Sequence, residues 1–233
     1  MNQAIIFDTE TTGVNEPVIV EAAWLLLDDP ANCGICDKFL GRYNPGKPIE
    51  LGALATHHIL DQDVAGSPPA SEFRLPEGTA YIIGHNIDFD WRAVGEPPVK
   101  RICTLALSRY LHPELDAHTQ SAMLYHYAND RVLARENLRN AHSAAADVCN
   151  CARLLSCLLD ELEARGEMPA PVASWEDVWS ISERARIPTV MTFGKHKGQP
   201  IAEIPGDYKA WLLRQPDVDP YLAQALRAGG TGR

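Results

Sequence analysis

A short apolar strand that ends in two carboxylates is the feature of this 233-residue chain that most constrains its fold. Residues 3–7 are mainly apolar and β-branched, which predicts a buried strand. Asp8 and Glu10 follow, and residues i and i+2 of a strand lie on one face. Neighbouring carboxylates repel each other unless cations neutralise them, and Mg²⁺ prefers such oxygen ligands. Alone, the pair is also compatible with a polar strand end closed by a turn.

The remaining apolar stretches predict an α/β fold. Further strands are expected at residues 18–27, 38–44 and 80–83. Helical patterns cover residues 49–64, 119–128 and 142–162, while residues 102–105 fit either a strand edge or a turn before a helix. Strands come first and helices later, with one helix-linked strand between them. This order predicts a mixed sheet layered with helices.

Composition and the positions of Gly- and Pro-containing segments suggest the domain organisation. We expect a main domain over residues 1–165, a Gly- and Pro-containing linker over 166–173, and a small basic and aromatic module over 174–233. The hydrophobic fraction of 45% and charged fraction of 22% are ordinary for a globular protein. No apolar run approaches the ~18 residues of a membrane-spanning helix. The chain starts without a basic leader, so we expect a cytoplasmic protein that does not contact membranes.

Six cysteines are present, and in the cytoplasm we expect them to be reduced. Cys33 and Cys36 have the spacing of zinc ligands, but no second pair of ligands follows at a usual distance. The favoured interpretation is therefore two thiols in a tight turn between strands.

A second acidic motif, Gly84-His85-Asn86-Ile87-Asp88-Phe89-Asp90, follows the strand expected at residues 80–83. The carboxyl ends of strands are where α/β sheets bind ligands. On this pattern alone, Asp88 and Asp90 compete as the metal ligand. Asn86 has a structural alternative, because it could cap the helix that follows.

The third motif joins a histidine to a fourth carboxylate. His142 and Asp147 are separated by one serine and three alanines, at the start of the longest helical pattern. A carboxylate is favoured in the first turn of a helix, which is the structural alternative for Asp147. Four carboxylates could hold two cations about 3.5–4 Å apart, which clamp the attacking and leaving oxygens of a phosphodiester. His142, with an ordinary pKa of about 6.5, suits a general base.

In these motifs the chain resembles the DEDDh 3′→5′ exonuclease superfamily, which includes polymerase epsilon subunits and RNase T, and most closely its exonuclease X-like members. The family pattern has Asp-Thr-Glu-Thr, then His-Asn-x-x-Phe-Asp, then a His five residues before an Asp. Asp8-Thr9-Glu10-Thr11, His85–Asp90 and His142 with Asp147 match it in order. The resemblance implies an RNase H-like mixed five-stranded sheet flanked by helices.

The resemblance also assigns roles to residues. It implies two Mg²⁺ or Mn²⁺ ions held by the four carboxylates, with Asp90 rather than Asp88 as the central ligand and His142 as the catalytic base. Contacts to the 3′-terminal nucleotide are implied for the following residues: Thr11, Gly13, Val14, Leu54, His57 and Asn86. For His57 and its neighbour His58, exposed helical polarity is the alternative interpretation.

The C-terminal region extends the resemblance to about residue 214. Residues 184–214 carry six basic and two acidic residues, whereas the whole chain has a net charge of −10. Lys195, Lys197 and Lys209 alternate with Phe193, Tyr208 and Trp211, and such a surface can track phosphates and stack bases. We expect Lys195 and Lys197 to contact nucleic acid, and Tyr208 and Trp211 to form the module's core.

The predicted function is therefore an exonuclease that removes nucleoside 5′-monophosphates from DNA 3′ ends, in repair or recombination trimming. Its partners are single-stranded DNA or DNA 3′ ends, with a homodimer left open. The alternatives are an RNA-directed exoribonuclease or a polymerase-associated proofreading exonuclease, because the metal site does not distinguish RNA from DNA. A non-catalytic binding protein would require one of the five active-site residues to be missing, and none is.

Overall fold

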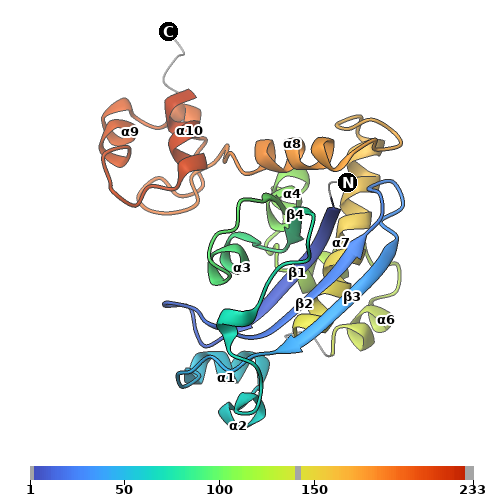
Figure 1. Ribbon diagram of the computed structural model, residues 1–233. Coiled ribbons are helices and arrows are strands. Elements are labelled where there is room, and N and C mark those ends of the chain that lie inside the picture. Colours follow the sequence, from blue (N-terminus) through green and yellow to red (C-terminus); the bar gives the residue numbers. More distant parts are fainter. Residues whose placement is uncertain (1–2, 140–142, 229–233) are drawn as a thin grey trace. The chain divides into compact units, whose positions relative to one another are not determined.

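A computed structural model describes residues 3–139 and 143–228 of the chain. At its centre is strand β1 (Gln3–Thr11), which lies in the middle of a five-stranded sheet of order β3-β2-β1-β4-β5 (Figure 1). Ala4, Ile5 and Ile6 are fully buried, because both faces of this strand are covered. The predicted buried strand that carries Asp8 and Glu10 is thus confirmed.

The sheet is mixed, as predicted. Strand β2 (Ile19–Leu27) pairs antiparallel with both β1 and the edge strand β3 (Ile35–Arg42). On the other side of β1, strands β4 (Thr79–Gly84) and β5 (Lys100–Cys103) pair in parallel. The carboxyl ends of β1 and β4 therefore meet at the same edge of the sheet, where the acidic motifs follow them.

The longest helix, α7 (Ala144–Ala164), packs on β1 and β2, and α4 (Thr104–Leu111) and α5 (Gln120–Tyr127) pack beside it. Its apolar stripe explains this position, because Leu154, Leu155 and Leu158 are fully buried. Residues 102–105 divide between the two expected structures, since β5 ends at Cys103 and α4 begins at Thr104.

Shorter elements surround the sheet. The helical pattern predicted over 49–64 is two helices, α1 (Leu51–His57) and α2 (Asp61–Val64), because His58 adopts a left-handed conformation with φ of 59°. The other short elements of this part are η1 (Ala70–Glu72), α3 (Asp88–Ala93) and α6 (Arg131–Asn137). Helix α6 was not predicted, and none of its residues is buried.

The chain divides into two compact units, Met1–Ser182 and Glu183–Arg233. Helix α8 (Trp175–Ala185) starts in the first unit, where the Cys103 amide donates to Ser182 Oγ at 2.8 Å and Tyr81 Oη donates to Glu176 at 2.7 Å. The division therefore falls later than the expected module start at residue 174. The expected linker 166–173 is packed on the first unit, because Met168 and Val172 are buried apolar side chains.

The second unit has its own core. It contains η2 (Ile201–Glu203), α9 (Gly206–Leu212) and α10 (Pro220–Ala228). Its buried residues form one apolar cluster: Met191, Ile201, Ile204, Leu212, Leu222, Ala225 and Leu226. Among the helices within residues 3–139 and 143–228, none combines the length and hydropathy needed to cross a membrane.

Candidate active site

Three carboxylates meet where β1 lies against the first turn of α7. One ligand oxygen from each of Asp8, Glu10 and Asp147 lies within 4.8 Å of the others. Asp8 and Glu10 share a face of the strand, and α7 brings Asp147 over that face. Oxygen donors grouped in this way are the ligands that hard divalent cations prefer, so these residues could hold such a cation.

Asp90, on α3, is fixed against β1 next to this cluster. Its Oδ1 accepts hydrogen bonds from the Thr9 amide at 2.9 Å and from Thr9 Oγ1 at 2.7 Å. Asp90 is 5% exposed. Gly84, at the end of β4, allows this approach, because a Cβ there would lie 2.9 Å from the carbonyl oxygen of Phe7.

The carboxylates of the cluster raise one another's pKa values. Burial raises the pKa of Glu10 to about 8, with further contributions from the charges of Asp147, Glu21 and Asp90. Burial, followed by the neighbouring charges of Asp90 and Asp147, likewise holds the pKa of Asp8 well above its ordinary value. Divalent cations would relieve this repulsion between carboxylates.

Asp88 has a different environment from Asp90. Its Oδ1 pairs with Arg101 Nη1 at 2.6 Å, and the Arg101 guanidinium lies 4.0 Å from the centroid of the Trp91 ring. Asp88 is therefore engaged with Arg101 of β5, whose guanidinium also lies over Trp91 of α3. This geometry favours Asp90 as the fourth ligand.

The predicted base, His142, lies outside the described residues. The structure does describe the helix start that follows it. Ser143 is the N-cap of α7, and its side chain accepts from the Ala146 amide at 3.4 Å. The Gln120 side chain donates to the carbonyl oxygen of Asp147 at 3.2 Å, which ties α5 to this turn. The role of His142 remains a prediction from the sequence.

The segment after β1 is joined to α1. The Glu50 amide donates to the carbonyl oxygen of Thr12 at 2.8 Å, and Thr11 Oγ1 donates to the carbonyl oxygen of Gly13 at 3.0 Å. Gly13 packs against Glu50 so closely that a Cβ would overlap its carboxylate. Of the predicted contact residues, Val14 follows this segment directly and is 76% exposed, and Leu54 lies on α1 and is partly buried.

His57 is buried rather than exposed on its helix. Its Nδ1 accepts from the Ile59 amide at 3.0 Å, so Nε2 carries the proton and donates to the carbonyl oxygen of Thr11 at 3.2 Å. Burial lowers its pKa, which favours this neutral form. Both ring nitrogens are thus engaged with the main chain, and any action of His57 on a nucleotide would pass through Thr11.

Asn86 is exposed and adopts φ of 71°, and α3 shows no side-chain cap, so the capping alternative is not what the structure shows. His85 is engaged on both ring nitrogens, with Thr104 Oγ1 at 3.0 Å and the carbonyl oxygen of His118 at 2.8 Å. His85 therefore braces the motif, and Asn86 is the residue of the pair that faces solvent.

The second unit presents the two predicted lysines. Lys195 and Lys197 are exposed, and Lys195 lines a 270 Å³ pocket with Tyr208 and Trp211. Lys209, which was grouped with them in the sequence pattern, is buried and donates to the carbonyl oxygen of Ala202 at 3.2 Å. It is therefore not part of the basic surface.

The aromatic residues of this unit differ in burial. Tyr208 packs on the apolar core of the unit, as expected. Trp211 was also expected in that core, but it is 47% exposed, with its ring centroid 5.3 Å from that of Tyr208. Trp211 is therefore a partly exposed aromatic residue beside Tyr208.

Cys33 and Cys36 are free thiols. Among the residues that the structure describes, the acidic triplet is the cluster with metal-ligand geometry, and neither cysteine belongs to it. Cys33 Sγ lies 3.4 Å from the carbonyl oxygen of Pro30, in the turn between β2 and β3.

Sequence reasoning missed two contributors to the site. Thr9 anchors Asp90, and its position between the two acidic residues of β1 was the available signal. Glu21 lies directly across from Glu10 in the register of β1 and β2 and pairs with Arg42 at 3.0 Å. The proximity of Glu21 to Glu10 could be predicted only once the pairing register of β1 and β2 was known.

Comparison with known proteins agrees with this geometry. No protein-family model matches the chain. Exodeoxyribonuclease 10 of Escherichia coli (strain K12) is 28% identical over 231 residues, covering 95% of this chain and 96% of that protein. The structure of Exonuclease X in complex with 5′ overhanging duplex DNA has a TM-score of 0.59 and 28% identity, covering 77% of this chain and 99% of that one.

A third relative is a much larger protein, of which only a part matches this chain. PolC-type DNA polymerase III of Latilactobacillus sakei is 29% identical over 181 residues, which is 70% of this chain but 12% of the polymerase. The fold and the acidic site define a nuclease of the RNase H-like class. The resemblance to the DEDDh exonuclease superfamily that the motifs predicted is confirmed by these comparisons, and Exodeoxyribonuclease 10 is similar to the chain along nearly its whole length.

Proposed function

We propose that this chain is a metal-dependent 3′→5′ exonuclease that hydrolyses phosphodiester bonds at DNA 3′ ends and releases nucleoside 5′-monophosphates. The observation that carries the proposal is the meeting of Asp8, Glu10 and Asp147 at one point, with Asp90 fixed beside them by Thr9. Similarity to Exodeoxyribonuclease 10 over 95% of the chain supports DNA as the substrate. Trimming in repair or recombination is the role we assign to this activity.

The four carboxylates would hold two Mg²⁺ or Mn²⁺ ions. When bound, such ions supply the Lewis acidity that favours ionisation of a water and stabilises charge on the departing oxygen. The chain's own contribution is a rigid set of ligands, because Asp90 is held by two hydrogen bonds and Asp147 sits on a capped helix. Rigid placement preserves the in-line geometry on which the rate depends.

His142 would accept the proton of the attacking water. The water oxygen forms a bond to phosphorus while the bond from phosphorus to the 3′-oxygen breaks. The leaving oxygen takes a proton from solvent, so the products are a nucleoside 5′-monophosphate and a strand with a new 3′-hydroxyl. A histidine with a pKa near its ordinary value performs this task best close to neutral pH.

The segment Thr11–Val14 and α1 would hold the 3′-terminal nucleotide. His57 fixes the carbonyl oxygen of Thr11, and the Glu50 amide fixes that of Thr12. Val14 presents an exposed apolar side chain, against which a base can pack. Leu54 and the exposed Asn86 complete the proposed contacts.

A gel assay tests the proposal. Single-stranded DNA and RNA, each labelled at the 5′ end, are incubated with Mg²⁺ or with EDTA, and Asp90→Asn is run beside the wild type. A metal-dependent ladder that shortens from the 3′ end on DNA, and is absent with the variant, supports it. Faster shortening of RNA would favour the exoribonuclease alternative. No cleavage by folded protein with Mg²⁺ present would refute it.

Proofreading is a second candidate, favoured by the similarity to a part of PolC-type polymerase III. A proofreading nuclease acts on a primer end and prefers a mismatched terminus. Comparing removal of a matched and a mismatched 3′-terminal nucleotide from a duplex would separate the two candidates. Equal rates would argue for general trimming.

A further inference from the structure

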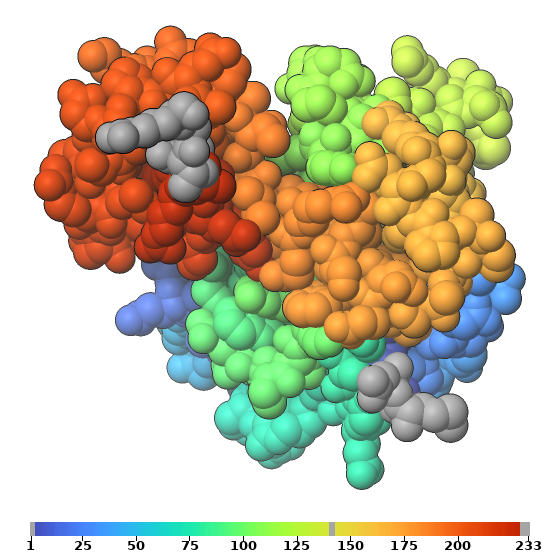
Figure 2. All heavy atoms as spheres, turned by 90° about the horizontal axis from the view of Figure 1, so that it is seen from above, coloured from blue at the N-terminus to red at the C-terminus, as the bar shows by residue number. Residues whose placement is uncertain are grey.

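The second unit contains a pocket between the loop at residues 192–198 and helix α9. Its volume is 270 Å³, and six residues line it: Lys195, His196, Pro205, Asp207, Tyr208 and Trp211. In the space-filling view, the orange segment that carries the loop and α9 lies at the surface of this unit (Figure 2). The pocket is therefore built within one unit, from segments that carry none of the metal ligands.

The pocket has a fixed shape, because the loop and α9 pack on each other through Tyr208. Gly194 has φ of 69°, and a Cβ there would lie 3.0 Å from the Tyr208 hydroxyl oxygen. His196 is buried, its Nδ1 lies 2.7 Å from Gln199 Oε1, and its ring centroid lies 4.5 Å from that of Tyr208. A preformed pocket loses little conformational freedom when it binds a ligand.

Two lining residues of different chemistry remain accessible. Trp211 is 47% exposed, and its ring is tilted by 43° from that of Tyr208, so these two rings are not stacked face to face. Lys195 is exposed, and among the described residues no ion pair or hydrogen bond engages its ammonium group. A ligand can therefore reach both side chains without displacing a polar interaction.

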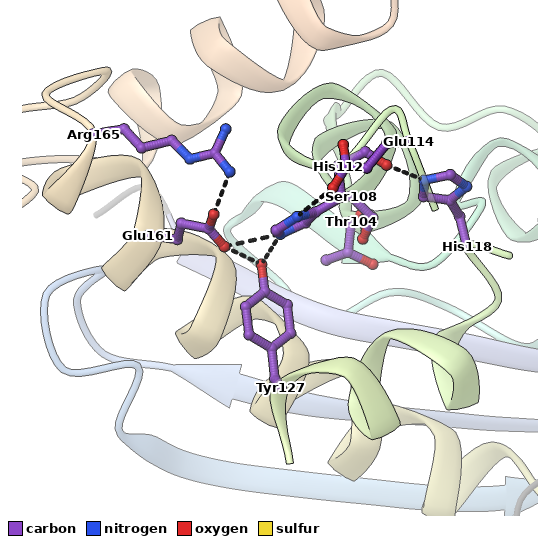
Figure 3. A network of polar contacts seen from close by, with 8 residues as sticks. All are labelled: Thr104, Ser108, His112, Glu114, His118, Tyr127, Glu161 and Arg165. Atoms are coloured by element: carbon purple, nitrogen blue, oxygen red, sulfur yellow. Dashed lines mark hydrogen bonds and ion pairs between the residues drawn. The ribbon is translucent and has the colours of Figure 1, made fainter. Parts of the chain in front are cut away.

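The polar network of the first unit differs in this respect. As Figure 3 shows, His112 Nε2 lies 2.8 Å from the Tyr127 hydroxyl and 2.9 Å from Glu161, and Arg165 pairs with the same carboxylate. Because these groups already bind one another, the network joins the end of α4 to α5 and α7. The accessible cation and aromatic ring of the second unit are better suited to a ligand.

The lining of the pocket determines the class of ligand. The Trp211 ring favours a planar group, and Lys195 favours an anion. The exposed carboxylate of Asp207 opposes a small free anion such as inorganic phosphate, which gains nothing from the ring in return. Lys195 opposes a cationic ligand for the corresponding reason. A nucleotide in a single strand satisfies both residues, since its base can stack and its phosphate carries the negative charge.

We propose that this pocket binds one unpaired nucleotide of single-stranded DNA, with the base stacked on Trp211 and an adjacent phosphate on Lys195. Every base has a flat face, so the pocket holds any base and does not read the sequence. A base within a duplex is already paired and stacked, so the pocket selects single strands. DNA as the ligand rests on the proposed function, but binding here needs neither the metal ligands nor a 3′ end.

Fluorescence anisotropy of the full chain tests the pocket, with labelled single strands in EDTA so that no metal-dependent cleavage occurs. One strand is oligothymidylate, and the other has the same length and phosphates but abasic sugars in place of the nucleosides. Both are titrated into wild type, Trp211→Leu, Trp211→Phe and Phe193→Leu. Phe193 is the matched control, because it is 46% exposed in the same unit but does not line the pocket.

We expect Trp211→Leu to bind oligothymidylate about ten-fold more weakly than wild type, as the loss of one base stack predicts. Trp211→Phe keeps a ring and should recover most of that affinity, and Phe193→Leu should bind as wild type does. The abasic strand should bind wild type and Trp211→Leu equally. Thermal unfolding should show the variants to be folded like wild type, because both replaced side chains are partly exposed.

The proposed binding site is overturned if folded wild type does not bind oligothymidylate, or if folded Trp211→Leu binds it as wild type does. It is also overturned if Phe193→Leu loses as much affinity, or if the abasic strand shows the same loss with Trp211→Leu. None of these outcomes involves cleavage, so the exonuclease reaction is tested separately by the gel assay.

Discussion

At the residue scale, the crowded carboxylates of the site lower the stability of the folded state when they are charged. Glu10 lies across from Glu21 and beside Asp147, and its pKa is raised to about 8. A carboxylate with a raised pKa in the folded state destabilises that state as the pH rises from the unfolded value toward the folded one. The metal-free protein should therefore be less stable at pH 8 than its packing alone would allow.

Glu10→Gln tests this cost. In EDTA at pH 8, the variant should be more stable than wild type by about 1–2 kcal/mol, because one crowded charge is removed. Mg²⁺ should raise the melting temperature of wild type and much less that of the variant, since ligand binding stabilises the folded state. Differential scanning calorimetry measures both effects. A variant less stable than wild type in EDTA would contradict this electrostatic account.

Asp88 and Asp90 form a matched pair on one helix. Asp90→Asn should reduce the rate of DNA cleavage at least about a hundred-fold, because misplaced ligands disturb the geometry of the reaction. Asp88→Asn should retain most of the activity and lose at most about 1 kcal/mol of stability with the Arg101 ion pair. Steady-state kinetics and thermal unfolding of both variants decide the assignment. Equal losses of activity would show that Asp88 also acts in the site.

At the element scale, His85 joins three parts of the first unit. It follows β4, contacts Thr104 at the start of α4, and contacts the carbonyl oxygen of His118 ahead of α5. His118 Nε2 in turn lies 2.7 Å from the carbonyl oxygen of His112. This chain of polar contacts links the acidic edge of the sheet to the network around Tyr127 and Glu161.

The brace makes the fold sensitive to acid. Burial lowers the pKa of His85 to about 4, below its ordinary value of 6.5. Its contribution to stability is therefore complete above pH 6.5 and is lost as the pH falls toward 4, because the unfolded chain binds the proton first. Between pH 6.5 and pH 4, the free energy of unfolding of His85→Gln should fall by about 1–3 kcal/mol less than that of wild type. Urea unfolding across this range measures the difference, and parallel curves would contradict the prediction.

Some of the helices and strands could be predicted from the sequence and others could not. The buried β1 strand and α7 followed from apolar patterns, because those residues pack on the core whatever surrounds them. Helix α6 did not, since its exposed sequence has no apolar stripe that a pattern could reveal. The burial of His57 was equally hidden, because it depends on a left-handed residue, His58, that ends α1.

At the scale of the whole molecule, charge is divided between the two units. Counting along the sequence, Met1–Ser182 carries 13 basic and 26 acidic residues, whereas Glu183–Arg233 carries eight basic and five acidic. The net negative charge of the chain thus resides in the unit with the carboxylate cluster. The smaller unit has the positive balance that a phosphate-binding surface needs.

Lys195→Ala with Lys197→Ala tests this surface. Binding of single-stranded DNA should weaken, and the slope of log affinity against log salt should fall by about 1.4, because each lost phosphate contact removes about 0.7. Lys38→Ala with Lys47→Ala in the first unit removes the same charge and serves as the control. Fluorescence anisotropy at several salt concentrations gives the slopes. Identical slopes for wild type and the Lys195 and Lys197 double variant would assign these lysines another role.

The most direct test of the central claim is the identity of the first product. A single strand of DNA carrying its label in the 3′-terminal nucleotide is digested with Mg²⁺, and the released label is compared with standards by chromatography. We predict that the label appears at once as a nucleoside 5′-monophosphate, and that EDTA or Asp90→Asn abolishes its release. Early release of a nucleoside 3′-monophosphate, of a longer fragment, or of nucleotides from the 5′ end would contradict the proposed reaction.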